Sequence, residues 1–262
     1  MKMMGVVELI DRVKKEKRFT LTEAESKTLL SAYGIPVVEE AIVTTEQSAV
    51  EQAHELGFPI VLKGLGARLT HKTERGLVKV NLKSDAEVRR AYAEIKLSAG
   101  KDWEGCLVQP LITGKREFVA GLFRDPQFGP AVMFGLGGIF TEALNDVTFR
   151  IAPLTDVQAA TMLDEIKAHA LLGDFRGEMP ANREQLLQVL TGLSRLGVEH
   201  PEIREVDINP LIIMPDGRIK AVDALVVLRE AEVAALGDVM VDEKQRQKKE
   251  KEIRAAIGAM TN

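Results

Sequence analysis

The chain has 262 residues, of which 45% are hydrophobic and 28% are charged, and its formal net charge is -4 at pH 7. This balance is ordinary for a globular protein with a substantial core, and the negative charge argues against nucleic-acid binding, which needs a concentrated basic surface. No stretch approaches the ~18 consecutive apolar residues of a membrane span, and the N-terminal residues lack the apolar core of a signal peptide. We therefore expect a cytoplasmic protein that contacts neither nucleic acid nor membrane.

Residues 1–100 are predicted to alternate helices with short strands. Thr22 and Glu25 form a capping box at the start of a helix that stops at Tyr33-Gly34. The predicted helices cover 1–18, 22–33 and 45–56 and a segment beginning after Ser84, and the predicted strands cover 42–43, 59–63 and 77–82.

Beyond Gly100 the chain is rich in strands. The predicted strands are 106–112, 117–123, 131–134, 203–213 and 219–227, and the predicted helices are 156–172 and 183–196. Pro215-Asp216-Gly217 is a hairpin signal between the last two strands. This order predicts an α+β or mixed α/β fold with two subdomains that share a cleft. The charged, weakly amphipathic C-terminus is predicted to form either a solvated helix or a helix that contacts a partner.

Cys106 is the only cysteine, so the chain can form no internal disulfide and offers no zinc framework. Because apolar residues follow it, we expect a small core residue rather than a nucleophile.

Two candidate residues, Lys63 and His71, lie just before and within the glycine-bearing stretch 64–76. Lys63 lies at the end of a predicted strand, just before Gly64-Leu65-Gly66, where a cation and a flexible backbone suit a polyphosphate. The alternative is a lysine whose stem lies along apolar surface while its ammonium group reaches water. His71 lies in a polar segment between glycines, which is either a surface loop or the position of a nucleophile or base.

A second glycine-rich turn, 134–140, includes Gly137 and follows a predicted strand. Alone, such a cluster is a weak signal for phosphate approach. Arg150 lies further along the chain, and its bidentate guanidinium group would suit a phosphate or a carboxylate.

The strongest pattern is an acidic hairpin. Glu205, Asp207 and Asn209 alternate with apolar residues, so a strand places their side chains on one face. Asp223 follows across the predicted turn, and strand pairing would bring it beside Asn209. Oxygen ligands of this kind suit Mg²⁺, which takes one or two carboxylates and completes its shell with water and nucleotide phosphates. The alternative is the polar outer face of an amphipathic hairpin.

Taken together, these motifs resemble the ATP-grasp subunit of acyl-CoA synthetases of the type that forms a nucleoside diphosphate, and most closely the β subunit of ADP-forming acetate–CoA ligase. The resemblance extends from about residue 20 to residue 228. It rests on Lys63, the His-Lys-Thr-Glu-x-Gly segment at 71–76, Gly135-x-Gly-Gly, Asp207-x-Asn-Pro-Leu and Asp223.

The resemblance implies an ATP-grasp fold with a nucleotide held between two subdomains. Its reaction is acyl-CoA + ADP + phosphate ⇌ acid + CoA + ATP, through an acyl phosphate and a phosphohistidine. It implies that ATP or ADP is the substrate and Mg²⁺ the cofactor. The implied roles are phosphate contact for Lys63, adenine contact near Val108, Gln109 and Leu111, ribose contact for Glu117, Mg²⁺ binding for Asn209 and Asp223, phosphate transfer for His71, and a place beside the phosphohistidine for Asp207. Gly137 and Arg150 are candidate nucleotide contacts because of their residue types.

The resemblance also implies a domain plan and a partner. The implied segments are a helical extension (1–19), an N-terminal half with the lid (20–110), a C-terminal half with the metal site (111–228) and a charged helical tail (229–262). The CoA-binding domains of the family find no counterpart here, so we expect a separate CoA-binding α subunit in a hetero-oligomer.

Two other functions fit the sequence. A stand-alone ATP-grasp carboxylate–amine ligase would share the fold but need no phosphohistidine. A nucleotide-sensing subunit would need no metal ligands, so the presence of Asp207, Asn209 and Asp223 argues against it.

Overall fold

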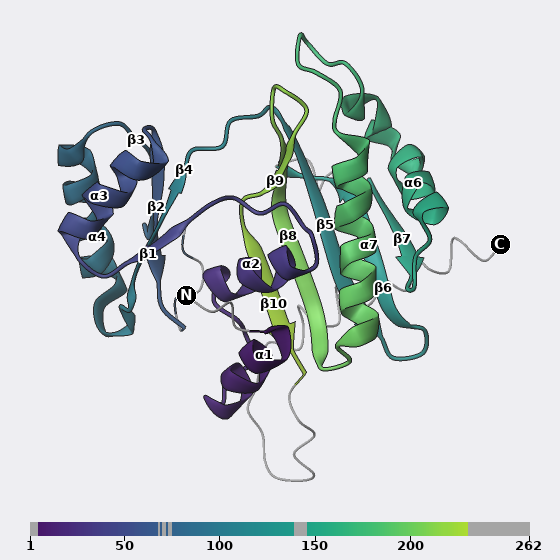
Figure 1. The fold of residues 1–262 in the computed structure, drawn as a ribbon, viewed down its shortest axis with the longest axis horizontal. Coiled ribbons are helices and arrows are strands. Elements are labelled where there is room, and N and C mark those ends of the chain that lie inside the picture. The colour runs from purple at the N-terminus through teal and green to yellow at the C-terminus, as the bar shows by residue number, and fades with distance from the viewer. Residues whose placement is uncertain (1–4, 68, 70–71, 73–74, 139–145, 230–262) are drawn as a thin grey trace. The chain divides into compact units, whose positions relative to one another are not determined.

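The computed structural model describes residues 5–67, 69, 72, 75–138 and 146–229 (Figure 1). They form two antiparallel sheets, one of four strands and one of six, with helices packed against both. The predicted mixture of helices and strands in two subdomains is confirmed. No helix in these described ranges is long and apolar enough to cross a membrane.

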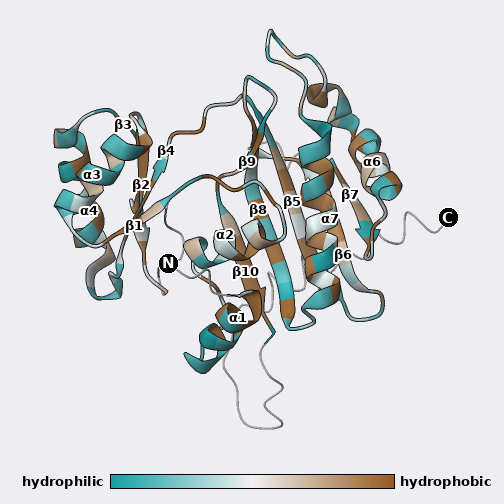
Figure 2. Cartoon of the chain, viewed as in Figure 1, coloured by the Kyte–Doolittle hydropathy of each residue, from teal (hydrophilic) through white to brown (hydrophobic). Residues whose placement is uncertain are grey.

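The smaller sheet has the strand order β1-β4-β2-β3. Its strands are β1 (Ala41–Val43), β2 (Ile60–Leu65), β3 (Val78–Leu82) and β4 (Gly105–Pro110). Helices α3 (Glu46–Leu56) and α4 (Asp85–Ala99) pack on one face, followed by the short 3-10 helix η1 (Gly100–Asp102). Figure 2 shows hydrophilic colouring over much of both α-helices, while their apolar residues enter a core with Ile60, Leu62 and Val108. Burying this apolar stripe holds the layers together.

The larger sheet has the order β10-β8-β5-β6-β7, and β9 pairs with β8. Its strands are β5 (Arg116–Asp125), β6 (Gly129–Leu136), β7 (Val147–Ile151), β8 (Ile203–Ile213), β9 (Ile219–Ala221) and β10 (Ala224–Leu228). Helices α6 (Asp156–Glu165) and α7 (Arg183–Glu199) lie on one face of it (Figure 1). Gly197 of α7 lies close to Leu122, which identifies the face of β5 that carries Leu122 as the helix-covered face.

Helices α1 (Val6–Lys15) and α2 (Glu23–Ala32) belong to the core of the larger sheet, with Leu29 and Leu30 completely buried in it. The backbone N–H of Val226 on β10 donates to the hydroxyl of Ser26 at 3.1 Å. Helix α2, which the expected segment 20–110 groups with the smaller sheet, therefore packs against the larger one. The chain starts against the larger sheet, leaves to build the smaller one, and returns at β5.

Three further expectations need correction in the second half. The predicted helix over 156–172 is broken, because Ile166 is extended and the 3-10 helix η3 (Lys167–Leu172) follows. The buried Asp146 carboxylate accepts the first backbone N–H groups of that segment, from Lys167 and Ala168, at 2.6 and 2.7 Å. Strand β7 was not predicted, and the predicted strand 219–227 is interrupted between β9 and β10. The predicted tail lies outside the described residues.

The capping box of α2 is confirmed, and it also stabilises the junction with α1. The Glu25 carboxylate accepts from Arg12 at 2.7 Å, from Arg18 at 2.8 Å and from the Thr22 backbone at 2.8 Å. Burial by itself would raise the pKa of Glu25, but hydrogen bonds from Arg18 and Thr22 lower it to about 2.

We expect Glu25→Gln to lower the free energy of unfolding at neutral pH by about 1–2 kcal/mol. A carboxyl group with a lowered pKa stabilises the fold above its ordinary pKa of 4.5, and that stabilisation is lost as the pH falls toward 2. Urea unfolding over a series of pH values should therefore show the two proteins converging in acid. A constant difference at all pH values would contradict this assignment.

Candidate functional site

Lys63 lies within β2 rather than at its end, and its side chain is only 6% exposed. Its ammonium group donates to the Glu23 carboxylate at 2.6 Å and to the backbone carbonyl of Val222 at 3.3 Å. The nearer carboxylate oxygen of Asp223 lies 3.6 Å away. The alternative of a lysine that reaches bulk water is therefore wrong, and the structure brings Lys63 to the acidic hairpin.

Glu23 is the centre of a buried group of charges that we name the Glu23 cluster: Glu23, Lys27, Lys63 and Lys72. The ammonium groups of Lys27 and Lys72 both lie 2.8 Å from the Glu23 carboxylate. Burial would raise the pKa of Glu23, but Lys63, Lys27 and Lys72 together hold it far below its usual range. Burial lowers the pKa of Lys63, and the charges of Glu23 and Asp223 outweigh it and raise that pKa. Glu23 and Lys63 are therefore both charged at neutral pH.

The acidic hairpin forms as predicted. β8 pairs with β9 and β10, and the backbone N–H of Asn209 donates to the carbonyl oxygen of Asp223 at 3.3 Å. A small pocket of about 200 Å³ lies here, lined by Asp207, Asn209, Asp223, Ala224 and Leu225. One Asp223 carboxylate oxygen accepts from the Ala224 backbone N–H at 2.9 Å, which fixes the side chain.

The donors of this pocket fit a hard divalent cation. They are two carboxylates and one amide, all of oxygen type, and Mg²⁺ takes one or two carboxylates alongside phosphate and water oxygens. Within the described ranges, no group of three or more His, Cys, Asp or Glu side chains forms an all-protein metal cage. Burial and the charge of Glu23 raise the pKa of Asp223, opposed by Lys63, so this carboxylate carries an unfavourable charge that a cation would relieve.

The predicted adenine-contacting edge is divided between two faces of β4. Val108 is completely buried in the core of the smaller sheet. Gln109 points the other way, and its amide oxygen accepts from Lys27 at 3.1 Å, which ties it to the Glu23 cluster. The backbone N–H of Leu111 donates to the carbonyl oxygen of Pro59 at 3.0 Å. Any contact of Val108 with adenine would therefore have to be made by its backbone.

Glu117 lies on β5, and Gly137, which directly follows the last residue of β6, lies beside it. The backbone N–H of Gly137 donates to the carbonyl oxygen of Glu117 at 2.8 Å. A Cβ at Gly137 would lie 2.8 Å from the backbone of Phe118, so only glycine allows this approach. Glu117 pairs with Ile212 of β8, on the face of the larger sheet opposite the helices. That face also carries Asp207, which pairs with Gly121 four residues further along β5.

Arg150 is not brought to the other predicted residues. It lies on β7, three strand positions from β8. It pairs with Val132, which is buried in the core on the helix-covered face, so Arg150 belongs to that face as well. Its guanidinium group forms an ion pair with Glu165 at the end of α6. Its role in nucleotide binding stays a prediction that this geometry does not support.

His71 lies outside the described residues. Cys106 is completely buried, and burial raises the pKa of its thiol to about 12, which agrees with a core residue rather than a nucleophile.

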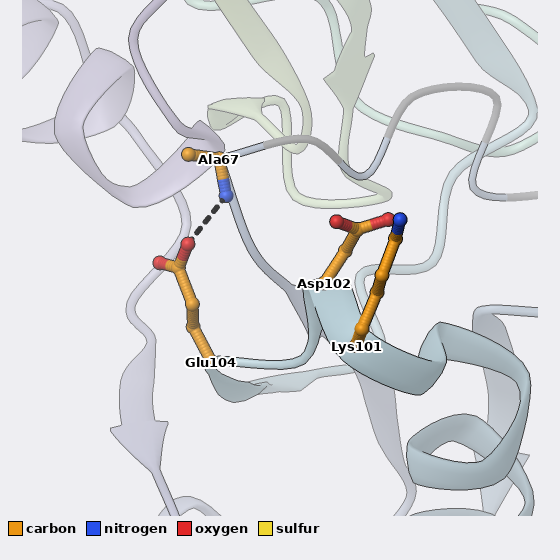
Figure 3. A pocket seen from close by; sticks show the side chains of 4 residues that line it. All are labelled: Ala67, Lys101, Asp102 and Glu104. Atoms are coloured by element: carbon orange, nitrogen blue, oxygen red, sulfur yellow. Dashed lines mark hydrogen bonds between the residues drawn. The ribbon is translucent and has the colours of Figure 1, made fainter.

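A second pocket, of about 240 Å³, is lined by Ala67, Lys101, Asp102 and Glu104 (Figure 3). The backbone N–H of Ala67 donates to the Glu104 carboxylate at 2.9 Å. None of the described residues predicted for the site lines it.

Glu23, Lys27 and Lys72 are absent from the sequence-based set of site residues. A pattern on α2 indicates that Glu23 and Lys27 face inward. The buried residues of this helix include Glu23, Ser26, Lys27 and Leu30. Their spacing of i, i+3, i+4 and i+7 marks the inward face of a helix. A glutamate and a lysine on that face indicate a buried ion pair, because such charges are rarely buried without partners.

Comparison with known proteins shows the family of the chain. Residues 12–228 match the ATP-grasp domain family. The chain is 44% identical to the β subunit of ADP-forming acetate–CoA ligase I of Pyrococcus furiosus, over 84% of this chain and 97% of that protein. It is 40% identical to the ADP-forming 4-hydroxybutyrate–CoA ligase of Nitrosopumilus maritimus, over 80% of this chain but only 31% of that longer protein.

A solved structure is also similar. It is the dinucleotide-forming acetyl-coenzyme A synthetase 1 of Ca. Korarchaeum cryptofilum, in complex with coenzyme A and Mg-AMPPCP and with its phosphohistidine segment pointing towards the nucleotide binding site. The TM-score is 0.76 and the identity 44%, over 86% of this chain and all of the matched chain. The two sheets are therefore those of an ATP-grasp protein, and the chain belongs to the ATP-grasp family.

Proposed function

We propose that the chain is the nucleotide-binding β subunit of an ADP-forming acyl-CoA synthetase. With a separate CoA-binding α subunit it would catalyse acyl-CoA + ADP + phosphate ⇌ acid + CoA + ATP. The observation that carries the proposal is the approach of Lys63 to Asp223 beside the pocket of Asp207 and Asn209. The β-subunit relative, matched over nearly its whole length, supports the need for a partner. We also propose a cytoplasmic location.

In this function each side chain has a distinct task. Lys63 would contact the nucleotide phosphates, the edge at Gln109 and Leu111 would receive adenine, and Glu117 would bind the ribose. Asn209 and Asp223 would hold Mg²⁺, which on binding neutralises phosphate charge and fixes the geometry of phosphoryl transfer. Asp207 would lie beside the phosphohistidine.

The transfer step itself is a displacement at phosphorus. An oxygen of the β-phosphate of ADP attacks the phosphoryl group on the histidine nitrogen, the N–P bond breaks and an O–P bond of ATP forms. The nitrogen keeps the electron pair of the broken bond. We propose His71 as the histidine that receives the phosphoryl group on the nucleotide side.

Incubating the full chain with γ-labelled ATP and Mg²⁺ tests the proposal. We expect label on the protein that is acid-labile and base-stable, and that is lost in His71→Ala. Unlabelled protein that joins a carboxylate to an amine would instead favour the stand-alone ligase.

We expect the purified chain to bind Mg-ADP but to form acyl-CoA only after a CoA-binding subunit is added. The physical reason is that the proposed ligands all serve the nucleotide. The measurement is the loss of free CoA thiol in the presence of acid and Mg-ATP, with and without the partner. Full activity of the chain alone would overturn the two-subunit assignment.

A further inference from the structure

The Glu23 cluster contains more positive than negative charge. Both oxygens of one carboxylate are used, since one accepts from Lys27 and Lys63 and the other from Lys72. The Glu23 side chain is only 3% exposed, so water screens the three ammonium groups poorly from one another. Without the Glu23 charge, Lys63 and Lys72 would each lose the carboxylate that their ammonium groups contact.

The three lysines differ in how completely their donors are used. An ammonium group has three donors. Those of Lys27 go to Glu23, Glu40 and Gln109, at 2.8, 2.7 and 3.1 Å, and this side chain is only 2% exposed. Lys27 is therefore a fixed anchor with no donor left for a ligand.

Lys63 and Lys72 retain donor capacity. Lys63 has two acceptors within hydrogen-bond distance, and the next oxygen, that of Asp223, lies 3.6 Å away. For Lys72, the hydrogen bond found for its ammonium group within the described ranges is the one to Glu23, and its side chain is 19% exposed. These two cations could bind an incoming anion without losing Glu23.

Glu23 also joins segments that otherwise belong to different cores. It lies on α2, which packs with the larger sheet, whereas Lys63 lies on β2 of the smaller sheet. Lys72 lies on the segment between β2 and β3, where its carbonyl oxygen accepts from the backbone of Leu77 at 2.8 Å. One carboxylate on α2 thus contacts the ammonium groups of two lysines that lie on β2 and on the segment after it.

We propose that Glu23 is a positioning residue for phosphate binding, which holds Lys63 and Lys72 at a set spacing so that Lys72 acts as a second phosphate-binding cation. This inference rests on the proposed function. A merely structural Glu23 would support binding of every part of the nucleotide equally. A positioning Glu23 supports only the part that carries phosphate.

The test compares Mg-ADP with adenosine as ligands of the full chain, by calorimetry for the nucleotide and ligand-observed NMR for the nucleoside. We expect Glu23→Gln, which keeps the shape and removes the charge, to weaken Mg-ADP binding about tenfold or more. Adenosine binding should stay unchanged. Lys72→Gln, at a partly exposed side chain, should show the same selective loss without a change in thermal stability.

Glu25→Gln is the matched control. It makes the same chemical change two residues away on α2, in an ion pair with Arg12 and Arg18, and should leave the affinity for both ligands unchanged. Unchanged or tighter Mg-ADP binding in Glu23→Gln would overturn the inference, and so would an equal loss for adenosine. An unaltered parent chain that binds no Mg-ADP would instead overturn the proposed function itself.

Discussion

Replacing Asp223 with asparagine is expected to slow phosphoryl transfer from ATP by about 10²–10³-fold, on the proposed function. The substitution keeps the size of the side chain and an oxygen that accepts from the Ala224 backbone, so the local fold should persist. It removes one of the two carboxylates of the pocket and the anionic partner that lies 3.6 Å from Lys63.

Two consequences of that change can be separated by varying the Mg²⁺ concentration. If Asp223 is a metal ligand, the Mg²⁺ concentration at half-maximal rate rises, and excess Mg²⁺ partly restores transfer. If Asp223 acts only through Lys63, the half-maximal concentration stays the same and the maximal rate falls. Single-turnover transfer from γ-labelled ATP measures both quantities.

Asp216→Asn provides the control for this experiment. Asp216 lies in the turn between β8 and β9, where its carboxylate pairs with Arg218 at 2.7 Å and is 46% exposed. The same chemical change there should leave the rate and its Mg²⁺ dependence unaltered. An unchanged rate in Asp223→Asn would remove this residue from the proposed metal site.

The acidic hairpin was predictable because its information is local. Alternation along β8 sets which side chains share a face, and a turn signal sets where the chain reverses. These two features are enough to bring Asp223 beside Asn209. The interruption at Val222 and Asp223 was not predictable in the same way, because it depends on β8 pairing with β9 and then β10.

The Glu23 cluster was not predicted, because its contacts are long-range. Glu23 and Lys63 are 40 positions apart, and Lys27 and Gln109 are 82 apart. A capping box fixes where α2 begins, but not which sheet it packs against. The packing of α2 against the larger sheet and the Glu23 cluster both depend on such long-range contacts.

Arg150 illustrates a different limit. A bidentate cation after a glycine-rich turn is a reasonable phosphate ligand, but residue type does not reveal the face of a strand. Because β7 was not predicted, neither its register with β6 nor the ion pair of Arg150 with Glu165 could be anticipated.

Arg116 is the residue whose loss should destabilise the fold most. It is the largest fully buried side chain among the residues that the structure describes, and its guanidinium group donates to the Glu178 carboxylate at 3.2 Å. It also donates to three backbone carbonyls, those of Leu171, Gly173 and Met179, at 3.2, 3.1 and 2.7 Å. This one side chain therefore ties β5 to the segment between α6 and α7.

We expect Arg116→Ala to lower the free energy of unfolding by about 3–5 kcal/mol, because it leaves the buried Glu178 carboxylate unpaired and opens a cavity. Arg116→Lys should recover only part of this loss, since one ammonium group cannot reach acceptors that a planar fork spans. Urea unfolding of the full chain measures both.

Arg183→Ala is the comparison that decides the cause. Arg183 pairs with Asp164 at 2.8 Å, but the two side chains are 47% and 63% exposed, so its removal should cost about 0–1 kcal/mol. Equal losses in Arg116→Ala and Arg183→Ala would show that burial of the guanidinium group does not matter. Glu117 follows Arg116 on the opposite face of β5. On the proposed function, Arg116→Ala should therefore also weaken the proposed contact of Glu117 with ribose, whereas Arg183→Ala should not.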